Sequence, residues 1–326
     1  MTQPAVVPPP DPSVVRLARH RPGARRLSSA LVAGVAVSVV AILVGHAWIP
    51  NSHGLGSAVD TVLPWSVLPG AMLVALSLWL RMRAGVVAGV AGMLVYAWMF
   101  GPVLIHRPPG GPHDLRVATL NLGAGSTAPA RSVRAVAGTG ADLVVLQELT
   151  DANREAAESV LQAGYPFHGV AGTVGVWSRR PLSNARPVDI DIGWVRGLRT
   201  DVMTAHGGTV TVYAAHLASA RPGATGGRDH TLSALASLVA ADPGRQLMVI
   251  GDLNTATTDR KLAAFAPLRD TQSEAGEGFG FTFPAALPLM RPDHILQRGM
   301  QARRAWVVDA PAADHRIAVA DLDTAE

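Results

Sequence analysis

The first third of this 326-residue chain contains three long apolar segments, which constrain its fold more than any other feature. The segments are Leu27–Ile49, Val62–Leu80 and Ala84–Ile105, and none contains Asp, Glu, Lys or Arg. Each approaches or exceeds the ~20 residues that cross a bilayer. A buried bundle in a soluble domain is the alternative, but three such runs so close together disfavour it. A signal peptide is disfavoured too, because its apolar core is shorter. We therefore predict three transmembrane helices over residues 27–105.

Arginine placement predicts the orientation of these helices. Residues 1–26 are rich in proline and arginine without apolar periodicity, so we expect a disordered basic tail. Arg81 and Arg83 lie in the turn between the second and third segments, whereas residues 50–60 contain neither Lys nor Arg. The positive-inside rule then puts tail and turn in the cytoplasm. We expect a multi-pass protein of the cell membrane, with a cytoplasmic N-terminus and an extracytoplasmic domain after Ile105.

The chain changes character after residues 106–113, which form a short linker rich in proline and glycine. From residue 114 to residue 326, short apolar segments alternate with amphipathic ones, a pattern typical of an α/β domain. Strands are expected at Leu115–Leu122, Leu143–Leu146, Val174–Ser178, Thr209–His216, Leu247–Ile250 and Ile295–Gln297. Helices are expected at Arg131–Ala137, Ala152–Gln162 and Thr231–Ala240.

Composition restricts the chemistry of this domain. The chain contains no cysteine, which excludes disulfides and thiolate ligands, so any metal must be held by oxygen or imidazole. Residues 1–113 carry eight basic and two acidic residues, whereas the remainder carries 20 basic and 22 acidic ones. The excess positive charge therefore lies outside the α/β domain. This division disfavours, without excluding, a protein that holds long nucleic acid by phosphate neutralisation.

Polar residues recur at the ends of the expected strands. Each is a weak signal alone, because an Asn after a strand is usually a turn residue, a Glu often caps the next helix, and most Asp-His pairs are structural. If the strand ends meet at one rim, the set offers oxygen ligands for a hard cation, imidazoles and a carboxylate to orient one of them. The residues are Asn121, Gln147, Glu148, His216, Asp252, Asn254, Asp293, His294, Asp314 and His315.

The segment after His216 is rich in glycine and contributes two cationic side chains, Arg221 and Arg228. It is either a solvated surface loop or a mobile loop that guides a phosphate to the site.

In their order along the chain, these blocks resemble the endonuclease/exonuclease/phosphatase superfamily over residues 115–322. The resemblance rests on "TLN" ending at Asn121, "LQE" ending at Glu148, the block around Trp177–Pro181, "HL" at His216, "GDLN" at Gly251–Asn254, "DHI" at Asp293 and "DH" at Asp314. The three preceding segments resemble those of membrane-anchored bacterial members. The resemblance implies a DNase I-like αββα four-layer sandwich with mixed sheets, here following three transmembrane helices.

The resemblance also implies roles for individual residues. Asn121, Glu148 and Asp314 would hold a metal, which is Mg²⁺ in this superfamily, with Mn²⁺ as the other candidate. His216, Asp252, Asn254, Asp293 and His315 would be the catalytic residues. Asp293 would orient His315, and the base that activates water is either Asp252, which we favour, or His315.

The expected function is a membrane-anchored, metal-dependent phosphoesterase that hydrolyses a phosphoester outside the cytoplasm by water attack at phosphorus. The phosphoester could belong to a lipid headgroup, a nucleic acid or a small phosphodiester, and the lipid bilayer is the other expected partner. An extracellular endonuclease or exonuclease is one alternative. A catalytically silent, membrane-tethered binding module is another, although Glu148, Asp252, Asn254 and His315 are all present. No protein partner is inferred.

Overall fold

The computed structural model describes residues 22–105, 111–221 and 223–324. Most of the expected tail, residues 1–21, and part of the expected linker, residues 106–110, lie outside the described residues. The chain divides into two compact units, which we describe separately. The first contains residues 1–42 and 67–95, and the second contains residues 43–66 and 96–326.

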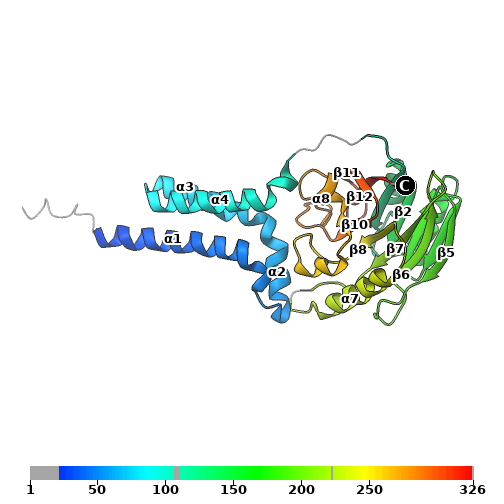
Figure 1. The fold of residues 1–326 in the computed structure, drawn as a ribbon, viewed down its shortest axis with the longest axis horizontal. Helices are drawn as coiled ribbons and strands as arrows, with labels where there is room; N and C mark the ends of the chain where they lie inside the picture. The colour runs from blue at the N-terminus through cyan, green and yellow to red at the C-terminus, as the bar shows by residue number, and fades with distance from the viewer. Residues whose placement is uncertain (1–21, 106–110, 222, 325–326) are drawn as a thin grey trace, which may run out of the picture. The chain divides into compact units, whose positions relative to one another are not determined.

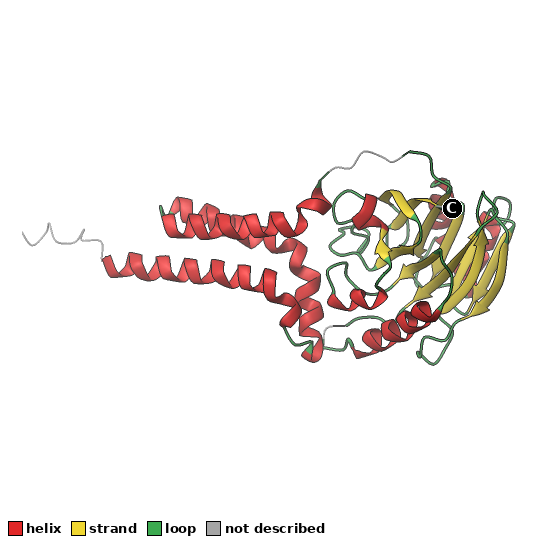
Figure 2. Ribbon diagram, in the orientation of Figure 1, coloured by secondary structure: helices red, strands yellow, loops and turns green. Residues whose placement is uncertain are grey.

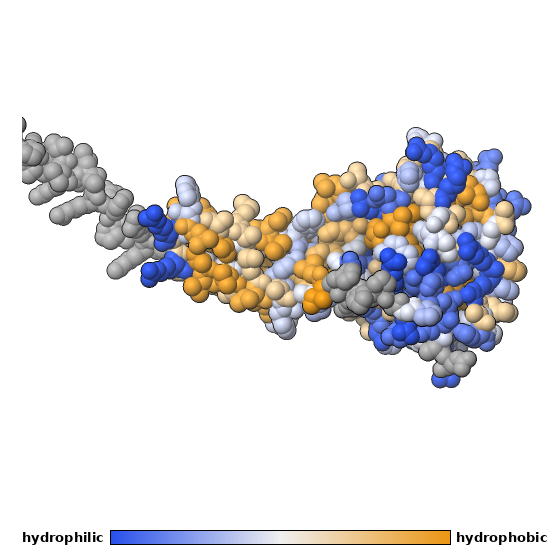
Figure 3. Space-filling model, turned by 90° about the horizontal axis from the view of Figure 1, so that it is seen from above, coloured by the Kyte–Doolittle hydropathy of each residue, from blue (hydrophilic) through white to orange (hydrophobic). Residues whose placement is uncertain are grey.

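The first unit is built from long apolar helices (Figure 1). These are α1 (Pro22–Gly45), α3 (Val67–Trp79) and α4 (Arg83–Leu104), of which α1 and α4 end inside the second unit. Three helical stretches, 30–48, 52–79 and 83–104, are long and apolar enough to cross a membrane. Hydrophobic side chains cover much of the visible face of these helices, as Figure 3 shows. The three expected apolar helices are therefore present.

Glycines allow two of these helices to approach closely. A Cβ added at Gly89 of α4 would lie 2.6 Å from the side chain of Val74 on α3. Close backbone approach through small residues is typical of helices that pack in a membrane.

The helix boundaries differ from the sequence expectation in two places. Helix α1 begins at Pro22, five residues before the apolar segment starts. The expected second helix over Val62–Leu80 is not one regular helix. Val62 is the last residue of a separate helix, α2 (Leu55–Val62). The next four residues form a 3-10 turn, η4 (Leu63–Ser66), and α3 starts after it. Pro64 lies in that turn, and proline disrupts a helix because it has no N–H to donate.

The second unit contains two six-stranded mixed sheets, shown in yellow in Figure 2. The strand order is β11-β12-β1-β2-β4-β3 in one sheet and β5-β6-β7-β8-β10-β9 in the other. The strands are β1 (Leu115–Asn121), β2 (Leu143–Gln147), β3 (Phe167–Ala171), β4 (Val174–Ser178), β5 (Leu182–Pro187), β6 (Gly197–Met203), β7 (Thr209–His216), β8 (Leu247–Asp252), β9 (Arg269–Asp270), β10 (Asp293–Arg298), β11 (Gln301–Val308) and β12 (Ile317–Asp323). The remaining helices are η2 (His46–Trp48), η3 (Ser52–Gly54), α5 (Pro129–Gly138), α6 (Asp151–Leu161), α7 (Gly226–Ala241), η5 (Arg260–Phe265) and α8 (Thr271–Ala275).

Three hydrophobic cores hold these layers together. The first lies between the sheets, where Val117 and Val145 of one sheet cluster with Val212 and Ile250 of the other. The second lies between the first sheet and helices α5 and α6. The third joins α7 to the outer face of the second sheet, with Leu235 among its buried residues. The expected αββα four-layer sandwich is therefore confirmed, and all six expected strands and three expected helices lie within observed elements or overlap them.

Gly251 allows β8 to pass closely beside β7. Its φ of +140° is unfavourable for other residues, and a Cβ added there would lie 2.0 Å from the backbone oxygen of Ala215. We predict that Gly251→Ala lowers the free energy of unfolding by about 2 kcal/mol, because it adds backbone strain and a steric clash. The unfolding temperature of the full chain in detergent should fall by roughly 4–8 °C.

Gly207→Ala is the matched control for this prediction. Gly207 also has a positive φ, of +83°, but nothing lies within 4 Å of an added Cβ. Equal losses of stability in the two variants would show that the close approach at Gly251 is not important.

Candidate active site

Strand register aligns three polar residues in one row. In the parallel pair β7 and β8, His216 lies opposite Asp252. In the antiparallel pair β8 and β10, Asp293 lies opposite the same Asp252. Residues directly opposite each other on paired strands project from the same face of the sheet. The three side chains therefore meet at one end of the second sheet.

The first sheet contributes an amide and a carboxylate to the same place. Asn121 ends β1, and Glu148 directly follows β2, the parallel neighbour of β1. The Nδ2 atom of Asn121 donates to Glu148 Oε1 at 3.3 Å and to Asp252 Oδ2 at 3.0 Å. One amide thus joins two carboxylates that come from different sheets. Glu148 has a φ of +57°, a conformation that costs energy for a residue with a Cβ and is frequent at functional sites.

His315 is held by Asp293 on the far side of Asp252. Its Nδ1 atom lies 2.8 Å from Asp293 Oδ2, which also accepts a 2.6 Å hydrogen bond from Thr282. Burial alone would lower the pKa of His315, but the carboxylates of Asp293 and Asp252 outweigh it and raise the pKa to about 10. The imidazole is therefore a cation at neutral pH. Its Nε2 atom lies 3.9 Å from Asp252 Oδ2.

His216 has the opposite protonation state. It is almost completely buried, which lowers its pKa to about 4, and the nearby guanidinium of Arg196 acts in the same direction against the attraction of Asp252. Arg196 donates to His216 Nδ1, so the neutral ring carries its proton on Nε2. That atom lies 3.5 Å from Asp252 Oδ2. His216 is thus a neutral hydrogen-bond donor directed at the carboxylates.

The turn after β8 orients Asp252 itself. The backbone N–H of Asn254 donates to Asp252 Oδ1 at 2.8 Å. Asn254 has a φ of +47°, and its side-chain Nδ2 donates to the carbonyl of Leu217 at 3.1 Å. Asp314 lies across the site at Gly123, where an added Cβ would be 2.9 Å from its Oδ1.

Asp252, Asp293 and His315 are spaced like metal ligands, with one donor atom of each within 4.8 Å of the others. The buried group is compatible with a metal site. A second feature points to a cation nearby, since Glu148 Oε1 and Asp252 Oδ2 converge on a single donor. Carboxylate and carboxamide oxygens suit a hard divalent cation. Asp293 Oδ1 is buried and has no hydrogen-bond partner among the described residues.

These side chains line a pocket of about 510 Å³. Seven of the eight predicted site residues line it, and Asp293 lies behind His315 as its buried partner. Arg221 also lines it. Arg228, the other expected anion contact, is buried and pairs with Asp259 at 2.8 Å, so its charge is already compensated.

Sequence reasoning missed three contributors to the site. Arg196 lies just before β6 and outside any recognised block, and its guanidinium lies 5.0 Å from the ring centroid of Trp194. Thr282 lies in a long loop without a motif. Part of the pocket is lined by residues 54–62, which belong to the region that the sequence assigned to the membrane.

Comparisons with solved structures show which fold the chain shares. Solved structures that resemble the chain include a humanized TDP2 from D. rerio, with a TM-score of 0.56 and 18% identity, covering 65% of this chain and 99% of that one. Sphingomyelinase C from Streptomyces griseocarneus has a TM-score of 0.51 and 20% identity over 65% and 99% of the two chains. An endonuclease/exonuclease/phosphatase from Beutenbergia cavernae has a TM-score of 0.51 and 21% identity, covering 65% of this chain and 72% of that one. At these identities the likeness shows the DNase I-like fold alone.

A search of curated proteins found no match. The family model for the endonuclease/exonuclease/phosphatase family matches residues 118–315, a range that runs from β1 to His315 and so contains every predicted site residue. The chain belongs to the endonuclease/exonuclease/phosphatase family.

Proposed function

We propose that this protein is a membrane-anchored, metal-dependent phosphoesterase. The observation that carries the proposal is the row formed by His216, Asp252 and Asp293, with Glu148 facing it from the other sheet. Glu148 and Asn121 would hold the ion, with Asp314 as a further ligand from across the pocket, and oxygen donors favour Mg²⁺ or Mn²⁺. When bound, the ion would neutralise negative charge on the phosphate.

Side chains of the site would activate the water and stabilise the charge that develops on the phosphate. Asp252 is the proposed base, because it is a carboxylate oriented by the Asn254 N–H, whereas His315 already carries its proton at neutral pH. Water attack at phosphorus increases charge on the phosphate oxygens. His216 would donate a hydrogen bond to one of them through Nε2, and Asn254 would help to position the water or the phosphate. The His315 imidazolium, held by Asp293, would stabilise that charge.

We also propose that the protein spans the cell membrane three times, with the catalytic domain outside the cytoplasm. The basic turn at Arg81 and Arg83 and the absence of basic residues from 50–60 support this orientation. The grouping of residues 43–66 with the domain in one compact unit supports three spans in either orientation, because both segments then lie on the same side of the membrane.

We propose a small or lipid-borne phosphodiester as the substrate. Among the similar structures, one is a TDP2 bound to single-strand DNA product and another is a sphingomyelinase C. Residues 114–326 carry slightly more acidic than basic residues, which favours small or lipid-borne phosphodiesters over long nucleic acid. An extracellular nuclease remains the first alternative. A silent binding module is the second, and the completeness of the site disfavours it.

Removing the proposed ligand Glu148 should impair metal-dependent turnover. We predict that Glu148→Gln lowers kcat/KM for a phosphodiester by about 100-fold or more and raises the Mg²⁺ concentration needed for half-maximal activity, since even residues beyond the ligands change metal affinity 10–100-fold. EDTA should abolish wild-type activity, and added Mg²⁺ should restore it. Glu155→Gln, at an exposed position on α6, is the control, and an unchanged metal requirement in Glu148→Gln would refute the assignment.

Breaking the Asp293–His315 pair should slow the reaction while the proposed metal ligands Asn121, Glu148 and Asp314 stay in place. We predict that Asp293→Asn lowers kcat by about 10²–10⁴-fold, because the imidazole loses the carboxylate that keeps it charged and oriented. The conservative control is Asp309→Asn, which changes an 82% exposed side chain paired with Arg316. If both variants retained wild-type kcat in a steady-state assay, His315 would have no catalytic role.

Reporter fusions test the orientation. A reporter that is active only outside the cytoplasm should be active when fused after His113 and inactive when fused in the turn at Arg83. The reverse pattern would place the domain in the cytoplasm and would exclude every extracytoplasmic substrate.

A further inference from the structure

One wall of the catalytic pocket comes from outside residues 118–315, the range that the family model matches. Gly54, Ser57, Ala58, Thr61 and Val62 line the pocket together with Glu148, Asp252 and His315. Four of the five belong to α2, which lies between the first two long apolar helices in the sequence. We call α2 the wall helix. It belongs to the same compact unit as the catalytic residues.

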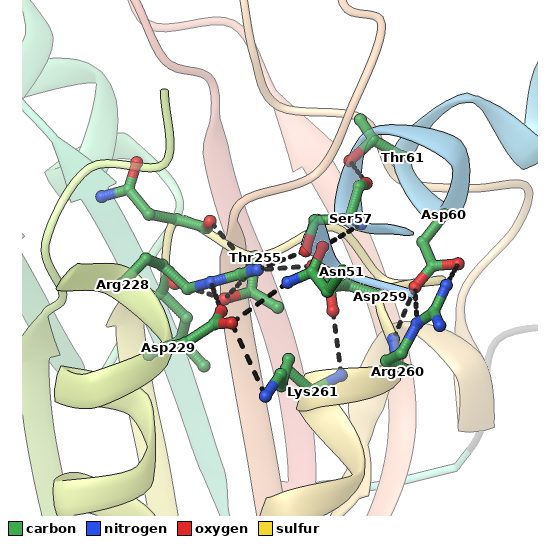
Figure 4. Close-up of polar contacts among 12 residues, drawn as sticks. Asn51, Ser57, Asp60, Thr61, Arg228, Asp229, Thr255, Asp259, Arg260 and Lys261 are labelled. Atoms are coloured by element: carbon green, nitrogen blue, oxygen red, sulfur yellow. Dashed lines mark hydrogen bonds and ion pairs between the residues drawn. The ribbon is translucent and has the colours of Figure 1, made fainter. Parts of the chain in front are cut away.

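A buried ion pair attaches the wall helix to the catalytic domain. Asp60 of the wall helix is fully buried, and its Oδ2 accepts a 2.8 Å hydrogen bond from Arg260 Nε. Figure 4 shows Arg260 and Asp60 facing each other. Arg260 also donates to the backbone carbonyls of His46, Ala47 and Ile49, just before the wall helix. Substitution of either residue would leave the other charge buried without its partner, which is costly.

A second network joins the wall helix to the turn that carries Asp252 and Asn254. Arg228 Nη2 donates to Ser57 Oγ at 2.8 Å, and Arg228 Nη1 donates to Thr255 Oγ1 at 3.1 Å (Figure 4). On the neighbouring side, Asn51 donates to Asp229 at 3.2 Å. The guanidinium of Arg228 therefore connects the wall helix to the residue that follows Asn254.

The segment after the wall helix supports another part of the pocket lining, which we call the rim and which contains Phe283 and Met290. Trp65 donates to the carbonyl of Leu289 at 2.9 Å, and its ring stacks on Phe281 with centroids 5.6 Å apart. Phe281 and Leu289 flank Phe283, which lines the pocket and packs against the ring of His315. Arg260 and Arg228 thus hold the wall helix on the domain, and Trp65, just after the wall helix, contacts the rim.

We propose that the wall helix determines specificity by closing one side of the active site, so that the site admits a small phosphoester with an apolar substituent and excludes the interior of a nucleic-acid strand. A volume of about 510 Å³ lies within the ~300–1,000 Å³ of pockets that hold one small ligand. Ala58 and Val62 line the wall, and Phe283 and Met290 line the rim, so apolar surface borders the site of the phosphate.

The charges around the pocket agree with this restriction. A groove that follows a nucleic-acid backbone needs a continuous series of cationic side chains. Here Arg221 is an exposed cation at the pocket, whereas Arg228 is neutralised by Asp259. This inference rests on the proposed phosphoester hydrolysis and adds that the wall helix determines which phosphoesters the site admits.

The absence of cysteine allows a direct test with the full chain in detergent. Ala58→Cys places a single thiol on the exposed, pocket-lining face of the wall helix, and Ser237→Cys places one on an exposed position of α7. Each protein is assayed with bis(4-nitrophenyl) phosphate before and after reaction with a bulky maleimide. We expect KM to rise, or kcat/KM to fall, at least tenfold on modification at residue 58, and to stay unchanged at residue 237. Retained activity at residue 58 would overturn the proposal.

A second measurement does not depend on turnover. Inorganic phosphate with Mg²⁺ should slow maleimide labelling at residue 58 severalfold and leave residue 237 unaffected, and equal rates at residue 58 would count against the wall. Wild-type protein is also assayed with a 20-nucleotide single strand of thymidylate. Internal cleavage of this strand as fast as the small diester would refute the exclusion while leaving the phosphoesterase function intact. If the wild type hydrolysed neither substrate, the proposed function would fail, and the labelling rates would still decide whether the wall helix borders a phosphate site.

Discussion

The backbone hydrogen bonds between β8 and its two neighbours determine the chemistry of this protein. They place His216 and Asp293 on either side of Asp252, one through a parallel pair and the other through an antiparallel pair. A shift of one residue in either register would turn a side chain to the opposite face of the sheet. Gly251 makes the close approach to β7 possible, and the turn after β8 brings the N–H of Asn254 to Asp252.

This arrangement places a neutral imidazole 3.5 Å and a cationic imidazole 3.9 Å from the same oxygen of Asp252. His216 is buried beside the cationic Arg196 and stays neutral, whereas His315 is buried beside the anionic Asp293 and is charged. The difference comes from the partner of each ring, since both rings are largely removed from water. Two histidines with distinct protonation states can serve distinct steps of one reaction at a single pH. In many hydrolases, such a difference in pKa between paired groups identifies the acid and the base.

The sequence predicted six of the twelve strands that the structure describes, among them continuous apolar runs such as Leu143–Leu146 and Leu247–Ile250, which leave few alternatives. It did not predict β3, β5, β6, β9, β11 or β12. The side chains of β5 are mostly exposed and β11 is interrupted by Arg303 and Arg304, so neither edge strand shows a clear apolar pattern. The order of motifs identified the family and the residues that meet in the pocket. Arg196 and the wall helix were missed because their contribution depends on tertiary contacts that no local pattern records.

The ion pair between Asp60 and Arg260 connects two parts of the chain that are 200 residues apart in sequence. The compact unit that contains the catalytic residues consists of residues 43–66 and 96–326, with α3 and most of α4 between these two segments. No single cut in the chain therefore separates this unit from the rest. A fragment that begins at the linker would keep every motif of the family and still lack the partner of Arg260, the Ser57 contact of Arg228 and one side of the pocket. The residues that carry the family motifs are therefore only part of the compact unit that forms the pocket. A soluble fragment that contained only the motifs would have a wider, more hydrated site than the intact chain.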